Sequence, residues 1–174
     1  MAPGRAVLIG RFCPVHVGHE AVLRAMFDRF GESQCLVGIG SSNHGVSIRH
    51  FFSYQERREF LLKVFPKLQL FGLPDYPGDH EWMVALDDIL RISGVDPATV
   101  TFFGGCQEEV EFFYRFGRTV EIMNRFDGST PKVSATEVRD ALIRERSLEK
   151  LLNPVIADEV RERFQGKWEA FKKM

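Results

Sequence analysis

Two histidines and two glycines occur together where an apolar run meets an amphipathic run near the start of the chain. Residues 10–19 follow the apolar residues 6–9, typical of a buried strand, and lead into residues 21–27, typical of a helix. A helix N-terminus has unpaired N–H groups and a positive dipole end, so this turn can bind a phosphate group. Gly18 lets the backbone approach a ligand closely. His16 and His19 should lie on the same side of the first helical turn, although two imidazoles there could also serve only as caps.

A second candidate anion site lies far along the chain, in residues 133–139. Ser134 and Glu137 have the spacing of a capping box, which predicts a helix beginning after Ser134. Thr136 and Arg139 lie one turn apart near the positive end of that helix, where they could hold a phosphate. The alternative is that the segment is a helix cap and nothing more.

These two segments resemble the nucleotidyltransferase superfamily that carries an HxGH signature, here residues 16–19. The preceding Gly10-Arg11-Phe12-x-Pro14 makes the archaeal-type nicotinamide-nucleotide adenylyltransferases the most similar branch. That superfamily also has a Ser-x-Thr-x-x-Arg near its C-terminal end, which matches residues 134–139, with Ala135 where the branch usually has glycine. The resemblance covers nearly the whole chain.

The resemblance implies roles for particular residues. The residues implied to act on the reacting phosphates are His16, His19, Arg11 and Arg139. The residues implied to bind ATP are Gly10, Arg11, Phe12, His16, Gly18, His19, Ser134, Thr136 and Arg139. The residues implied to bind the acceptor are Ser41, Arg49, Trp82 and Asn124. The Trp82 ring could stack on a pyridinium ring, although a core position on its helix is the alternative. Arg49 and Asn124 could equally be solvated loop residues.

The reaction implied by the resemblance is transfer of AMP from ATP to nicotinamide mononucleotide, which gives NAD and pyrophosphate. Mg²⁺ would be bound mainly through the ATP phosphates, since the sequence has no dedicated carboxylate cage or other metal-ligand spacing. Two alternatives remain open: a transferase of the same fold that uses another phosphate acceptor or CTP, and a nucleotide-binding sensor without catalytic activity. The chain departs from the branch at His50-Phe51, where an acidic residue or Asn and then Pro are usual. The shape of the loop over residues 42–52 and the choice of acceptor therefore stay open.

The order of elements predicts an α/β fold, a doubly wound, parallel, five-stranded Rossmann-like sheet with C-terminal helices. The expected strands cover residues 6–11, 34–39, 68–73, 100–103 and 119–123. The expected helices cover residues 18–30, 53–64, 81–92, 108–116, 135–145 and 157–172. Loops that follow strands should meet beyond the carboxyl edge of such a sheet, where ligands bind. We expect one domain over residues 1–174, with a helical extension from about residue 146.

Composition limits the partners. A net charge of −1 gives no electrostatic basis for binding nucleic acid or an anionic membrane. Three cysteines without metal-ligand spacing, and no apolar run long enough to span a bilayer, indicate a reducing cytoplasmic setting. The expected partners are ATP and a small phosphate-bearing acceptor; the oligomeric state is open, with a homo-oligomer among the alternatives.

Overall fold

The computed structural model describes residues 4–123 and 131–173 and contains a five-stranded, fully parallel sheet. The strands are β1 (Ala6–Gly10), β2 (Cys35–Gly40), β3 (Gln69–Leu73), β4 (Thr101–Gly104) and β5 (Thr119–Ile122). Their order in the sheet is β3-β2-β1-β4-β5, so the direction of winding reverses between β1 and β4. Ligands of doubly wound sheets bind beyond the carboxyl ends of the strands at this reversal, which is where the histidine-containing turn begins.

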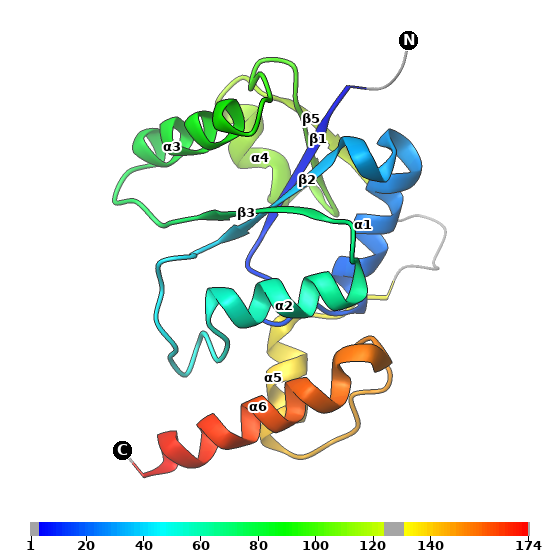
Figure 1. The fold of residues 1–174 in the computed structure, drawn as a ribbon, viewed down its shortest axis with the longest axis vertical. Coiled ribbons are helices and arrows are strands. Elements are labelled where there is room, and N and C mark those ends of the chain that lie inside the picture. The colour runs from blue at the N-terminus through cyan, green and yellow to red at the C-terminus, as the bar shows by residue number, and fades with distance from the viewer. Residues whose placement is uncertain (1–3, 124–130, 174) are drawn as a thin grey trace.

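Helices cover both faces of the sheet (Figure 1). They are α1 (Val17–Phe30), α2 (Tyr54–Val64), α3 (Asp79–Ile92), α4 (Gln107–Arg115), α5 (Ala135–Ile143) and α6 (Pro154–Lys172). Alternate residues of β1 point to opposite faces: Ala6 and Leu8 join the core beneath α1 and α2, whereas Val7 joins the core beneath α3 and α4. Both faces are therefore buried, as a parallel sheet requires.

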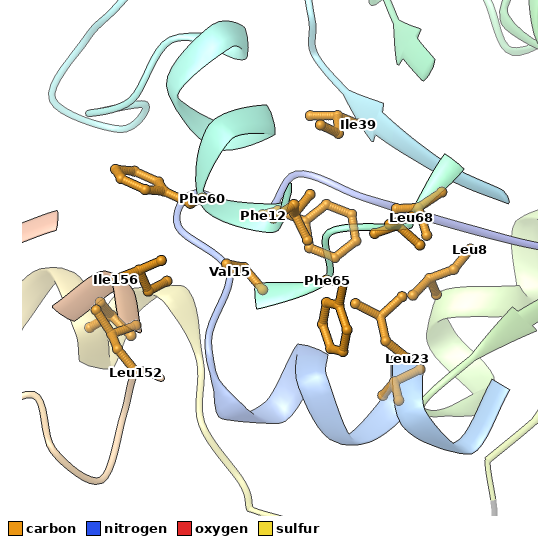
Figure 2. Packing of buried hydrophobic residues seen from close by; sticks show 14 of the residues in the cluster. Leu8, Phe12, Val15, Leu23, Ile39, Phe60, Phe65, Leu68, Leu152 and Ile156 are labelled. Atoms are coloured by element: carbon orange, nitrogen blue, oxygen red, sulfur yellow. The ribbon is translucent and has the colours of Figure 1, made fainter. Parts of the chain in front are cut away.

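The larger core extends from the sheet to the C-terminal helices. Figure 2 shows Leu8, Phe12 and Leu23 near the sheet and α1, and Leu152 and Ile156 at the far end of the same cluster. Two hydrogen bonds attach the segment before α6 to the start of α1: the Val17 N–H donates to the Leu151 carbonyl at 3.0 Å, and Asn153 donates to Glu20 at 3.2 Å. The C-terminal helices thus support the helix that follows the histidine turn.

The predicted fold class and all five predicted strands are confirmed, with ends that differ by one residue or so. The predicted start of the last helix at residue 157 is wrong by three residues, because Asn153 caps α6 through the Val155 N–H and Pro154 occupies its first turn. The third helix also begins earlier than expected, at Asp79. Among the described residues, the helices include none that is both long and apolar enough to cross a membrane.

Candidate active site

The turn after β1 has a strained backbone that only close packing can hold. Phe12 has a φ of 49°, in the left-handed region that is unfavourable for a bulky residue, and its side chain is 1% exposed. A Cβ atom on Gly10 would lie 2.9 Å from the Phe12 ring. Gly10 is therefore required by this turn, which places Arg11 and the following histidines beyond the end of β1.

His16 and His19 cap α1 with each other's backbone. His16 Nδ1 accepts a hydrogen bond from the His19 N–H, and His19 Nδ1 accepts one from the His16 N–H, both at 3.3 Å. The two rings stack with their centroids 3.7 Å apart and their planes at 22°. The capping alternative is therefore present in the structure, and it assigns one nitrogen of each ring.

The cap also fixes what the second nitrogen of each ring can do. A neutral imidazole whose Nδ1 accepts a hydrogen bond carries its proton on Nε2, so both histidines hold an N–H that the cap leaves unused. Burial lowers the pKa of His16 to about 4, against an opposing effect of Glu137. Burial and the neighbouring His16 lower the pKa of His19 well below its ordinary value. Both rings are therefore neutral at pH 7, and each can donate one hydrogen bond to a bound anion.

Gly18 brings the start of α1 against the segment that precedes α5. A Cβ atom at this position would lie 3.1 Å from the His16 ring and 3.1 Å from the Val133 carbonyl oxygen. The sequence suggested that Gly18 admits a ligand. In the structure the missing side chain also admits the second predicted anion-binding segment, which is 115 residues away along the chain.

Two adjoining cavities meet at Phe12 and His19. The first, of about 600 Å³, is partly apolar, and it contains His16, Gly18 and Ser134 together with strand residues of β1. The second, of about 290 Å³, is cationic and lies between the turn after β1, the loop before α2 and the start of α5. Its charged side chains are Arg11, Arg49 and Arg139. The arrangement offers a partly apolar site for a nucleoside next to a cationic site for its phosphates.

The start of α5 contributes to both cavities. Ser134 Oγ accepts from the Glu137 N–H at 3.2 Å and the Glu137 carboxylate accepts from the Ser134 N–H at 2.6 Å, so the predicted capping box is confirmed. Arg139 donates to Thr136 Oγ1 and to the Arg49 carbonyl, each at 3.4 Å. In the described part of the chain these long contacts are to neutral oxygens, which leaves the guanidinium charge available to an anion.

The expected acceptor residues do not all lie together. Arg49 is in the cationic cavity with Arg11 and Arg139, on the side expected to bind the donor phosphates. Ser41 is buried at the end of β2 and donates to Asp75 Oδ1 at 3.0 Å. Trp82 packs edge-on against Phe112 with ring centroids 5.2 Å apart, so part of its surface serves the core between α3 and α4. Asn124, expected in the acceptor site, lies outside the described residues.

One residue that positions the site was missed from the sequence. Arg57, near the start of α2, has a buried guanidinium, with 1% of the residue exposed. It donates to the carbonyls of Arg11 at 2.7 Å, Gly40 at 2.8 Å and Ser41 at 3.0 Å. Since Ser41 and Phe12 both have a φ of 49°, Arg57 holds the two left-handed turns at the ends of β1 and β2. The Glu56-Arg57 pair early in α2 is the signal in the sequence that could have pointed to this role.

The loop after β2 is tied to its surroundings by side chains rather than by regular structure. Asn43 and Asp75 exchange two hydrogen bonds, at 2.9 and 3.4 Å, and His44 Nε2 lies 2.9 Å from Asp75 Oδ2. Phe51, which stands where proline is usual, packs edge-on against Phe164 of α6 with ring centroids 4.6 Å apart. The departure at this position therefore anchors the loop to the C-terminal helix.

The described residues contain no cluster of three or more His, Cys, Asp or Glu side chains arranged to hold a metal ion. A divalent cation held through substrate phosphates would need no such cluster. The three arginines and two imidazole N–H groups are suited to the same phosphates.

Comparison with known proteins assigns both capped helix starts to one family. The model of the cytidylyltransferase-like family matches residues 7–141, which include both capped helix starts. The chain belongs to the cytidylyltransferase-like family. Among curated relatives, the nicotinamide-nucleotide adenylyltransferase of Pyrococcus furiosus is 26% identical over 166 residues, covering 91% of this chain and 83% of that protein. The protein of the same name from Thermococcus sibiricus is 27% identical over 165 residues, with the same coverage.

Solved structures agree on the fold. A bifunctional NMN adenylyltransferase/ADP ribose pyrophosphatase from Francisella tularensis, complexed with AMP and a manganese ion, has a TM-score of 0.71 and 16% identity. The match covers 94% of this chain and 51% of that one, so this chain spans about half of the bifunctional protein. A NadR protein in complex with NAD and AMP-PNP has a TM-score of 0.62 and 20% identity. These likenesses show the Rossmann-like nucleotidyltransferase fold.

Proposed function

We propose that this chain is an enzyme that transfers the adenylyl group of ATP to nicotinamide mononucleotide, giving NAD and pyrophosphate. The observation that carries the proposal is the reciprocal histidine cap between a nucleoside-sized cavity and a cationic cavity. The names of the archaeal relatives support the choice of acceptor. Membership of the cytidylyltransferase-like family supports nucleotidyl transfer in general.

In this proposal the nucleoside of ATP occupies the larger cavity and its phosphates extend past His19 into the cationic one. Arg11, Arg49 and Arg139 bind the phosphates that leave as pyrophosphate. The acceptor phosphate attacks the α-phosphorus in line, so no covalent intermediate with the protein is needed. A divalent cation bound to the phosphates would help to neutralise their charge.

The two imidazoles provide the transition-state contacts. Each Nε2–H donates to oxygens on which negative charge grows as the bond to pyrophosphate breaks, and the rings cannot rotate away because Nδ1 is held by the backbone. A fixed neutral donor needs little rearrangement during the reaction. We propose Ser41 and Trp82 as groups on the acceptor side, and Arg49, which lines the cationic cavity, as a group that binds the donor phosphates.

A substrate matrix tests the proposal. ATP and CTP are each incubated with nicotinamide mononucleotide, nicotinic acid mononucleotide, phosphopantetheine and glycerol 3-phosphate, and pyrophosphate release and the dinucleotide product are both measured. We expect the fastest release with ATP and nicotinamide mononucleotide, with NAD as the product. His19→Ala should abolish most of the activity, whereas His80→Ala, on the exposed surface of α3, should not. Faster turnover of another triphosphate–acceptor pair would assign that pair as the substrates. Nucleotide binding without pyrophosphate release from any pair would indicate a nucleotide-binding sensor without catalytic activity.

A further inference from the structure

His50 is a wall residue of the cationic cavity that neither the signature nor the proposed chemistry uses. It lines this cavity together with His19 and the three arginines. It also stands at the position where the chain departs from the pattern of the branch it resembles.

The ring of His50 has an unused hydrogen-bonding atom in a buried place. Nε2 is inaccessible to solvent and has no hydrogen-bond partner among the described residues. Buried polar atoms are nearly always paired. This unpaired atom belongs to a residue that lines the cavity, so a turn of the ring would bring its N–H to a ligand there. The residues around it include three cationic side chains, so an anion is the ligand that this cavity favours.

Neighbouring residues hold the ring in place before any ligand binds. His50 stacks on His44 with centroids 4.9 Å apart and planes at 12°, and His44 pairs with Asp75. The His50 backbone exchanges hydrogen bonds of 2.9 and 3.0 Å with Ser47, and its N–H also lies 3.2 Å from Ser47 Oγ. The side chain is thus positioned by the loop and need not be recruited from solvent.

Burial and the nearby cationic groups favour the neutral form of His50. Burial has the largest effect and lowers the pKa of the imidazole, and Arg11, His44 and Arg57 lower it further against the opposing effect of Asp75. A neutral ring at pH 7 can carry its proton on Nε2 and donate it to a phosphate oxygen without adding a fourth fixed charge to the cavity.

We propose that His50 binds the triphosphate of the donor nucleotide, donating a hydrogen bond from Nε2 to a phosphate oxygen held by Arg11, Arg49 and Arg139. This assignment deepens the proposed function and rests on its placement of the phosphates. The loop that differs from the family pattern then takes part in phosphate binding, and the Asp75–His44 pair sets the orientation of the ring.

Calorimetry with inorganic triphosphate and with ATP tests this assignment at pH 7. His50→Phe keeps a flat ring to stack on His44 but removes the donor, and His50→Gln restores an N–H near the place of Nε2. We expect His50→Phe to weaken both ligands about tenfold and His50→Gln to keep affinity within about threefold of the original. His80→Phe, the same change on the exposed surface of α3, should change neither affinity.

The outcomes separate this assignment from the proposed function. Unchanged triphosphate affinity in His50→Phe overturns it, and so does equal loss in the Phe and Gln variants, which would mean that the ring is only structural. A chain that binds no triphosphate also overturns it. If triphosphate binding depends on His50 but no NAD forms from ATP and nicotinamide mononucleotide, the proposed acceptor is wrong and the assignment of His50 stands.

Discussion

The starts of α1 and α5 face the same cavity and are closed by the same reciprocal hydrogen bonds, yet they present opposite chemistry. In α5 the pair is Ser134 and Glu137, which leaves a carboxylate beside the helix end. In α1 the pair is His16 and His19, which leaves two neutral N–H groups there. A carboxylate at the third position is a common helix cap, whereas an imidazole keeps the cap and removes the negative charge.

This difference shows how the same capping device can present hydrogen-bond donors to a ligand at one helix and a carboxylate at another. The first turn of any helix attracts anions. A glutamate in the capping box satisfies that attraction with the protein's own charge, as Glu137 and, in α2, Glu56 do. In α1 the capping pair itself carries no charge, although Glu20 also lies in the first turn, and the fixed Nε2–H groups are left for a ligand.

The largest loss of turnover should follow when the histidine at the third position of α1 is replaced by glutamate, the residue that α5 has at its third position. His19→Glu keeps a residue that can accept from the His16 N–H, so we expect a melting temperature within a few degrees of the original. It places a negative charge where phosphate should bind and removes one donor, so turnover should fall by at least about a thousandfold. His19→Gln can also cap the start of α1 and carries an amide N–H donor, so this variant should lose less turnover than His19→Glu. A folded His19→Glu variant with more than a tenth of normal turnover would contradict the assigned role.

Removing the cation from α5 should affect one substrate only. Arg139→Ala takes a charge-assisted contact from the triphosphate, for which about 1.5–3 kcal/mol is typical, so ATP should bind about 10- to 100-fold more weakly. Affinity for the mononucleotide should stay within about twofold. Arg144→Ala, at the other end of the same helix and paired with Asp140, is the matched control. Equal losses for both ligands in calorimetry would place Arg139 elsewhere.

Acid should weaken the histidine cap. Because the pKa of His16 in the folded chain is about 4, below its ordinary 6.5, the unfolded chain binds more protons between these values. Stability is therefore complete above about pH 6.5 and should fall by roughly 2–3 kcal/mol as the pH drops towards 4. Urea unfolding of the ligand-free chain measures this loss. The double variant His16→Asn, His19→Gln keeps capping groups without imidazoles, and an equally steep loss in it would contradict the prediction.

A change at Trp82, which lies away from both caps, should affect the mononucleotide and spare ATP. This is the opposite of the result expected for Arg139→Ala. If Trp82 stacks on the acceptor ring, Trp82→Leu should raise KM for the mononucleotide by up to about tenfold and leave KM for ATP unchanged. Phe112→Leu removes the packing partner of Trp82 and serves as the control for a purely structural role. If both variants lower the melting temperature and raise both KM values together, Trp82 belongs to the core alone.

The smallest change in ligand binding should come from removing the negative charge of Glu137 in the α5 cap. Glu137→Gln retains an oxygen that can accept from the Ser134 N–H, so stability should hardly change. Loss of a carboxylate from the cavity should tighten ATP binding by no more than about threefold and lower the pKa of His16 further, since Glu137 now raises it. Weaker binding by tenfold in calorimetry would mean that Glu137 itself contacts the ligand.

The sequence predicted what is local and could not predict what depends on strand register. The histidine turn and the Ser134 cap are short patterns, and their residues contact near neighbours, so both were recognised. Arg57 reaches carbonyls 46 and 17 residues away, and its role depends on β1 and β2 ending side by side. The pairing of His44 with Asp75 likewise requires β2 and β3 to be adjacent. Phe51 is explained by a helix more than a hundred residues later.

Nitrogen-15 NMR of the histidine rings tests the central claim most directly. With labelled histidine at pH 7, we expect His16 and His19 to show bare Nδ1 and protonated Nε2, and the same form to persist well below pH 6. Adding ATP should shift both Nε2–H signals, as a new hydrogen bond to phosphate requires. Signals assigned to the two rings by the His16→Asn and His19→Gln variants that instead show protonated Nδ1, or that do not move with ATP, would contradict the account.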